Sequence, residues 1–208
     1  MAIYHSDGIE IRRPPRNPWR DAILGMAGGV LGTMAMNRFW QALAAALPDD
    51  EEAERAEEQR RESSGDGPDT EEREGPLDDI SVVGPFNREE ESAPETMGRV
   101  AYTKLYGEEP SDETRGTRAT EIHWATGLAL GGLYGLLRGD ARDGLDLGGG
   151  LLFGAGAWLM NDEVLVPMLG LSDGPTAQEP AEHVKALGAH VVYGLATAAA
   201  TQALERVF

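Results

Sequence analysis

The residues that could do chemistry in this chain are a few polar and ionisable side chains set inside otherwise apolar runs. Each lies toward one end of its run, and together they are Asn37, Arg38, His123, Asn161, Asp162, Glu163 and His190. A charged group in an apolar helix pairs with another group or lines a pathway. Imidazole and carboxylate groups also suit divalent metals.

Three interpretations of this polar cluster stay open. It could be an ion pair with histidine hydrogen bonds that lock a helical bundle, a substrate or proton pathway, or a metal site using His123, His190 and a carboxylate. The sequence favours the lock, with Asp162 or Glu163 as the partner of Arg38. We predict no metal site, because no H-x-x-x-H or H-E-x-x-H spacing is present.

Other chemistries have no signature here. The chain has no cysteine, which excludes disulfides, thiolate ligands and cysteine nucleophiles. It also has no P-loop, no G-x-S-x-G elbow and no basic aromatic surface for nucleic acid. We therefore expect neither an enzyme nor a cofactor, and no nucleic-acid partner.

Four apolar runs must position the polar residues, at about 22–47, 122–137, 147–171 and 184–204. A membrane-spanning helix needs roughly 20 mostly apolar residues. The first and last runs reach that length, and the other two reach it only by including polar residues. We predict an all-α fold, a four-helix transmembrane bundle. The alternative is four buried helices of a water-soluble bundle.

Glycine content favours the membrane interpretation. Glycines spaced three or four residues apart occur in three of the runs: Gly25, Gly29, Gly32, Gly127, Gly131, Gly135 and Gly154. Each interior glycine costs a helix in water about 1 kcal/mol relative to alanine. In lipid, small residues at this spacing let two helices approach closely. We predict that these glycines are helix-packing positions.

Arginines in the short segments predict the orientation. They lie in the N-terminal segment 1–21, in the hinge between the second and third runs, and at Arg206, whereas 161–183 has no Lys or Arg. By the positive-inside rule both termini face the cytoplasm, in the cell's inner membrane. A cleaved signal peptide ending near Ala44–Ala46 is the weaker reading, because the run is long and contains Arg38.

The segments between the first two spans carry most of the formal net charge of −18. Residues 48–92 are rich in Glu, Asp, Ser and Gly, and we predict an acidic, largely disordered loop. Residues 93–121 form an interfacial helix and a connection, because Met97, Val100, Ala101 and Leu105 follow helical spacing beside Lys104. An ordinary packed surface helix is the alternative. Spans two to four occupy 122–208.

The runs also match in pairs, as in duplicated two-helix hairpins. The first and third share four residues at one offset: Gly25, Gly32, Met36 and Asn37 with Gly149, Gly156, Met160 and Asn161. The second and fourth share two: His123 and Gly127 with His190 and Gly194.

Three short motifs resemble a known family. They are His123-Trp124 with Gly127, Gly131 and Tyr134-Gly135; Pro167 to Ser172, read Pro-Met-Leu-Gly-Leu-Ser; and Gly188 to Gly194, read Gly-Ala-His-Val-Val-Tyr-Gly. They are similar to the YagU-like family of uncharacterised inner-membrane proteins. The resemblance covers the four apolar runs but not the acidic loop. It implies an inner-membrane location and no established chemistry.

We expect a non-enzymatic membrane component with a structural, assembly or stress-related role. The alternative is a small transporter or channel that works through the polar cluster. The expected partners are the lipid bilayer and a second copy of the chain or another membrane protein.

Overall fold

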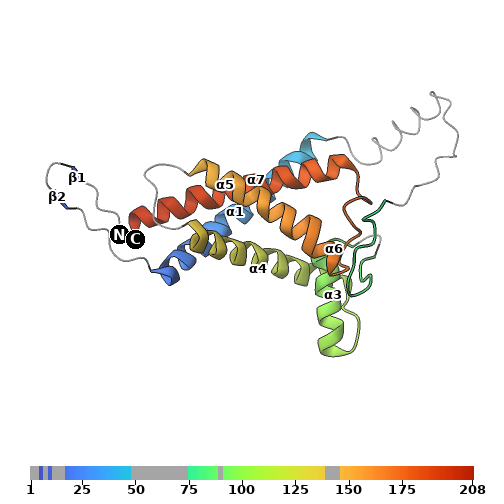
Figure 1. The fold of residues 1–208 in the computed structure, drawn as a ribbon. Coiled ribbons are helices and arrows are strands. Elements are labelled where there is room, and N and C mark those ends of the chain that lie inside the picture. Colours follow the sequence, from blue (N-terminus) through green and yellow to red (C-terminus); the bar gives the residue numbers. More distant parts are fainter. Residues whose placement is uncertain (1–4, 7–8, 11–16, 48–74, 89–90, 139–145) are drawn as a thin grey trace, which may run out of the picture.

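Four long helical segments lie along one another and make up most of the described chain (Figure 1). The computed structural model describes residues 5–6, 9–10, 17–47, 75–88, 91–138 and 146–208. The segments are α1 (Pro18–Ala46), α4 (Asp112–Arg138), α7 (Pro180–Val207), and α5 (Leu147–Met160) with its continuations η1 (Asn161–Leu165) and α6 (Val166–Met168). A fifth helix, α3 (Ala93–Tyr106), crosses one end, and two-residue strands β1 (His5–Ser6) and β2 (Ile9–Glu10) pair antiparallel.

The all-α prediction is thus confirmed for the described residues, apart from that minimal strand pair. The structure does not support the transmembrane part of the prediction. Among the helices of the described ranges, none combines the length and the apolar character required of a candidate membrane span.

The helices begin where local side chains cap them. Asn17 Oδ1 accepts from the Arg20 amide at 3.3 Å, and Pro18 fills the first turn of α1. Ser92 and Glu95 form a capping box at α3, whose C-terminal end is Gly107 at φ 78°. The Asp146 carboxylate accepts from the Gly149 amide at 2.9 Å and starts α5. Each contact satisfies a backbone group that the helix itself leaves unpaired.

Helix α4 is longer than the apolar run that predicts it. It begins at Asp112, so the connection after α3 shrinks to 107–111. The Thr114 amide donates to the Ser111 hydroxyl at 3.3 Å, and Arg115–Asp112 and Arg118–Glu121 pair one turn apart. Polar residues with such caps and pairs form helix as readily as apolar ones.

The predicted disorder of 48–92 does not hold for residues 75–88. The amides of Val82 and Phe86 donate to the carbonyls of Met168 and Gly170 at 3.0 and 2.7 Å, and the Gly174 amide donates to Asp78 at 2.7 Å. Backbone hydrogen bonds therefore dock this segment on the loop after α6, without a hydrophobic core of its own. Residues 48–74 lie outside the described residues.

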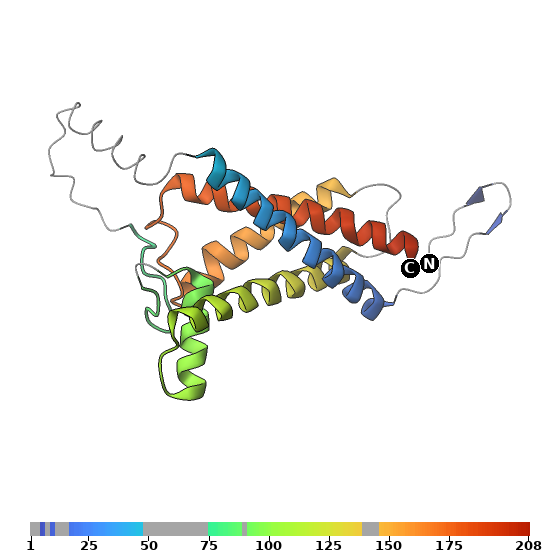
Figure 2. The same cartoon turned by 180° about the vertical axis from the view of Figure 1, so that it is seen from behind.

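Helix α1 lies at the centre, packed against α4 on one side and α7 on the other (Figures 1 and 2). Helix α5 packs on α7 and touches α4 only sparsely. The interior is rich in small residues, among them the fully buried Thr33, Ala189 and Thr197. A hydrophobic cluster within it joins Met36, Ala189 and Tyr193.

The two hairpins, α1–α4 and α5–α7, share one packing device in a register that differs from the prediction. A Cβ built on Gly131 would lie 2.6 Å from the Cα of Gly29, and one on Gly194 would lie 2.7 Å from the Cα of Gly154. The structure therefore matches Gly131, not Gly127, with Gly194. By the same contacts Gly25 and Gly29 correspond to Gly150 and Gly154, one residue later than the predicted match of Gly25 with Gly149.

Candidate functional site

The helix that carries Asn161, Asp162 and Glu163 changes its winding at those residues. A π-helical turn, η1, spans Asn161–Leu165 between α5 and α6. Pro167 follows, and a proline within a helix lacks an N–H and clashes with the carbonyl four residues before it. A wider turn relieves that clash, and such turns are frequent at functional sites.

Asp162 points from the π turn to helix α7. Its carboxylate lies 3.5 Å from Nδ1 of His190 and accepts from the Asn161 amide group at 2.8 Å. The same His190 nitrogen is 3.0 Å from the carbonyl oxygen of Ala186. Its N–H therefore has a backbone acceptor that is closer than the carboxylate.

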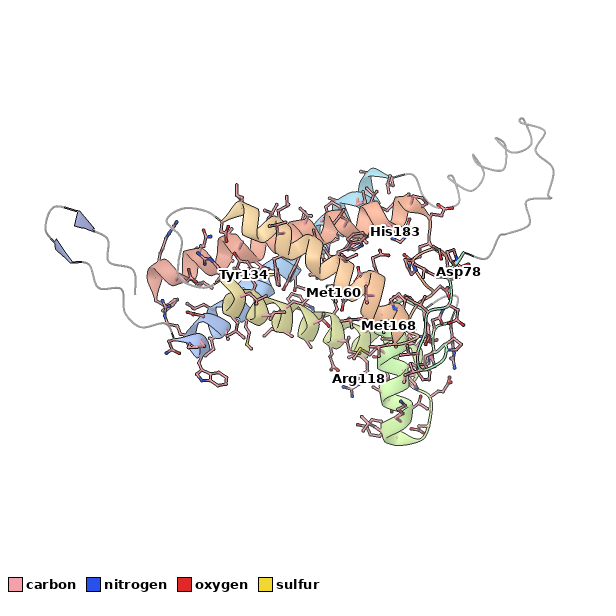
Figure 3. The ribbon with its side chains drawn as sticks, in the orientation of Figure 1. Asp78, Arg118, Tyr134, Met160, Met168 and His183 are labelled. Atoms are coloured by element: carbon pink, nitrogen blue, oxygen red, sulfur yellow. The ribbon has the colours of Figure 1, made fainter. Side chains whose placement is uncertain are left out.

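Glu163 makes the second link from the π turn to α7. Its Oε1 lies 2.6 Å from Nδ1 of His183, whose Nε2 lies 3.0 Å from the carbonyl of Pro175. His183 is not among the seven residues of the predicted cluster, although the sequence places it at the same end of the helices as His190. Figure 3 shows it at the same end of the bundle as Met168, with Tyr134 toward the other end.

The other hairpin holds a neutral counterpart of these contacts. Nε2 of His123 on α4 lies 3.0 Å from Oδ1 of Asn37 on α1, so the ring N–H donates to the amide oxygen. One turn along α4, the carbonyl of Gly127 accepts from the buried hydroxyl of Tyr193 at 2.7 Å. The structure thus brings six of the seven predicted polar residues into contacts that join facing helices or order the π turn.

Arg38 is the exception, and its predicted ion pair with Asp162 or Glu163 is wrong. Its side chain is exposed, and its guanidinium donates to Gln41 at 3.1 Å on the same helix. The reason is helical phase, because neighbouring residues point about 100° apart. Asn37 faces the interior, and Arg38 therefore faces away.

The cluster has no arrangement suited to a metal in the part of the chain that the structure describes. No three His, Asp or Glu side chains there converge as ligands of one ion. What the geometry offers is hydrogen bonding and proton exchange between imidazole and carboxylate groups.

The seven predicted packing glycines all lie at buried contacts between helices. Gly25 and Gly29 face Gly127, Gly131 and Gly135 across the α1–α4 seam. Gly32 faces Thr197 and Tyr193 of α7, and Gly154 faces the backbone of His190 and Val191. At each of them a side chain would meet atoms of the facing helix.

A second charged group, which the sequence did not predict, holds α3 in place. The Glu91 carboxylate is 4% exposed, accepts from Arg99 Nε at 2.8 Å and lies 3.5 Å from Arg115. Burial raises the pKa of Glu91, but the hydrogen bond and charge of Arg99 outweigh it and leave that pKa below its usual value. Hydrogen bonds from Ser92 lower the pKa of Glu95 likewise.

A third group closes the opposite end of the bundle. The Arg138 guanidinium of α4 lies 2.6 Å from the Glu205 carboxylate of α7, with their side chains 2% and 12% exposed. This pair ties one hairpin to the other.

The geometry as a whole is that of polar contacts between helices, at both ends of a small-residue interior. Comparison with models of protein families, with curated proteins and with solved structures finds no match to this chain.

Proposed function

We propose that this chain is a polytopic, non-enzymatic membrane component with a structural, assembly or stress-related role. The observation that carries the proposal is the distribution of side-chain size. Many large apolar side chains lie on the outside of the bundle, while glycine, alanine and threonine fill much of the inside beside a few large side chains such as Met36, Tyr134 and Tyr193. That is the reverse of what water selects.

Helix α1 illustrates the outer surface. Trp19, Ile23, Leu31 and Met34 are exposed, and Trp19 is 80% so. Trp40, also exposed, lies 21 residues after Trp19, or about 31 Å at the rise of an α-helix. The hydrocarbon core is about 30 Å thick, and tryptophans gather at its two surfaces.

Helices α4 and α5 continue this apolar surface. Their exposed leucines and methionines include Leu128, Leu133, Leu136, Leu137, Leu151, Leu152, Leu159 and Met160. Many large apolar side chains exposed on the helices of one bundle favour a membrane or protein contact. A bilayer covers all sides of a bundle at once, which a single protein partner does not.

The interior supports the same proposal. Helices in lipid associate through close packing of small residues and through polar contacts. The glycine seams of both hairpins and the Asn37–His123 contact are of this kind. We propose an inner-membrane location with both termini on the cytoplasmic side, in keeping with the resemblance to YagU-like proteins.

The test is retention of the tagged full-length chain in a membrane pellet after a wash in alkaline carbonate. We expect retention, and we expect Leu31→Glu to reduce it, because a charge in mid-membrane costs about 2.5–3.5 kcal/mol. The matched control is Val82→Glu, an exposed apolar residue of the docked segment 75–88, which should leave retention unchanged. Release of the unsubstituted chain by carbonate would defeat the proposal.

A second candidate function, a small transporter or channel, rests on the polar cluster. Asp162 and Glu163 carry carboxylates at the π turn and reach two histidines of α7, and ionisable groups inside a membrane bundle are functional candidates. Asp162→Asn and His190→Ala separate the two candidates. Variants that stay folded and retained but lose a flux or a phenotype would favour transport, and a loss of folding alone would favour the lock.

A further inference from the structure

Helix α3 runs across the long axis of the bundle, at the end where α4 begins (Figures 1 and 2). Both views show the long helices along one direction and α3 at a steep angle to them. If the long helices follow the membrane normal, α3 lies roughly parallel to the membrane plane.

Ionic contacts and close packing hold α3 in that direction. Arg99 pairs with the buried Glu91, which also contacts Arg115 of α4. Gly98 packs against α4, where a Cβ built on it would lie 2.9 Å from the Cβ of Arg118. The orientation of α3 is therefore fixed by contacts on one of its faces.

The other face of α3 carries an apolar stripe that no described residue covers. Met97, Ala101 and Leu105 follow one another at four-residue spacing, and all three are exposed, Leu105 by 78%. Tyr106 is exposed at the C-terminal end of the helix, and Lys104 lies beside the stripe. The buried residues Thr96 and Arg99 lie on the opposite face.

We propose that the stripe of Met97, Ala101 and Leu105 binds the headgroup–acyl boundary of the bilayer and anchors the bundle at a fixed depth. This inference rests on the proposed membrane location. An amphipathic helix lying in the membrane plane buries its apolar face at that boundary, with aromatic and basic side chains at the edge. Tyr106 and Lys104 are such residues.

The size of the stripe favours lipid over a second copy of the chain. A stable protein interface buries about 800 Å² on each partner. Three side chains along a helix of 14 residues fall well short of that. A lipid surface has no such requirement, because it adds to the contacts that the whole bundle makes with the bilayer.

The anchor also sets the depth of α4 and of the polar cluster. The first turns of α4 contain Asp112, Glu113, Arg115, Arg118 and Glu121, and they lie beside α3. With α3 at the boundary, these charges lie on its aqueous side, and His123 is the first ionisable residue of α4 below it.

The absence of cysteine from the chain makes a direct test simple. Single variants Met97→Cys, Ala101→Cys and Leu105→Cys of the full chain carry a nitroxide label and are reconstituted in phosphatidylcholine–phosphatidylglycerol vesicles. Collision of each label with oxygen, which concentrates in lipid, is compared with collision with a water-soluble nickel chelate. Leu152→Cys on α5 is the lipid reference and Glu113→Cys on α4 is the aqueous reference. Helix content by circular dichroism confirms that each variant is folded.

We expect all three α3 labels to shift from the Glu113 position toward the Leu152 position on the oxygen-to-nickel scale. If Leu152→Cys is lipid-exposed but the α3 labels behave like Glu113→Cys, the anchor is wrong and the membrane proposal stands. If Leu152→Cys itself is aqueous, the membrane proposal is wrong and the anchor falls with it. Spin–spin broadening at the α3 positions that disappears on dilution with unlabelled chain would show a second copy on the stripe, and would also overturn the anchor.

Discussion

The two hairpins use the same backbone contact and differ in what they place at its end. Gly131 lies against Gly29 in the first, and Gly194 lies against Gly154 in the second. In the first hairpin α1 continues as a regular helix, and its polar contact is the neutral Asn37–His123 pair. In the second, the helix winds into a π turn that presents two carboxylates to histidines.

A second difference lies in how each hairpin meets the other. Thr197 and Thr201 of α7 pack into Gly28 and Gly32 of α1 and bring those helices close. At the matching place between α4 and α5, the rings of Tyr134 and Phe153 contact each other at a tilt of 60°, with centroids 5.1 Å apart. Two aromatic rings keep helices apart where threonine and glycine let them meet. The comparison teaches that the same glycine–glycine contact builds each hairpin, while side-chain size decides how the hairpins join.

The largest effect should come from placing a large side chain at the glycine contact of each hairpin. Gly131→Leu and Gly194→Leu each place a side chain against the facing backbone, which cannot withdraw as a flexible side chain can. Overpacking of a core costs about 1–3 kcal/mol and sometimes more, and we expect both variants to exceed that range and fail to yield a folded bundle. The measurement is helix content and thermal unfolding in detergent.

The matched control for these two variants is Gly156→Leu, because nothing lies within 4 Å of a Cβ there. It should fold as well as the unsubstituted chain. If Gly194→Leu also folds normally while Gly131→Leu does not, the glycine contacts of the two hairpins are not equivalent, and the claim that both hairpins are built in the same way is wrong.

The next effect concerns the tie between hairpins. Arg138→Met leaves the Glu205 carboxylate buried without its cation, and breaking a buried ion pair in this way costs about 3–5 kcal/mol. The double variant Arg138→Met, Glu205→Met should recover much of the loss in a chemical-unfolding measurement. Equal stability of the single variant and the unsubstituted chain would mean that the pair does not hold the hairpins together.

The polar contacts should sharpen the comparison at a smaller scale. Asn37→Ala removes the acceptor of the half-buried His123 ring, and an unsatisfied donor costs about 1–3 kcal/mol. Asp162→Asn should cost less, because His190 already has the Ala186 carbonyl at 3.0 Å. The two free energies of unfolding, compared directly, test this order, and the reverse order would show that Asp162 is the main acceptor of His190.

The smallest effect is on α3 and the carboxylates that hold it in place. The pKa values of Glu91, Glu95 and Glu109 lie below their usual value of 4.5. A lowered pKa gives stability that is complete above about 4.5 and is lost as the pH falls through the folded-state value. We expect hydrogen exchange in α3, corrected for intrinsic rates, to accelerate on acidification before that of α1 does. In Glu91→Gln the acid effect should shrink, and an unchanged profile would assign it to other carboxylates.

The sequence predicts the all-α class and the packing positions well, because both depend on local spacing. Glycines four apart on one helix face identify Gly25 and Gly29 as a contact surface whatever helix lies opposite. The helical phase of those glycines also places Arg38 off the interior face, a signal available in the sequence and missed. For the polar residues, the sequence predicts only that they lie at the same end of the helices, and not which of them form pairs.

Other features depend on contacts far apart in the chain. Contacts between the helices set the register of the second hairpin one residue away from the predicted repeat, so that Asp162 rather than Asn161 lies as far after Gly150 as Asn37 lies after Gly25. No repeat in the sequence indicates such a shift. Segment 75–88 is held by backbone hydrogen bonds to residues 168–174 and by one from the Leu77 amide to the Thr176 hydroxyl, and backbone groups leave no compositional trace. The same is true of Glu91, whose burial depends on helices α3 and α4 together.

The glycine seams have a mechanical consequence. Two helices that meet through glycine present shallow ridges to each other, so sliding along the seam lifts few side chains out of their grooves. The correct alignment is then set by contacts at particular points along it. Asn37–His123 fixes α1 against α4, Tyr193 fixes α7 against the same stretch of α4, and Arg138–Glu205 fixes α4 and α7 at the other end. The glycine seams thus let the helices approach closely, and these polar pairs prevent them from sliding along one another.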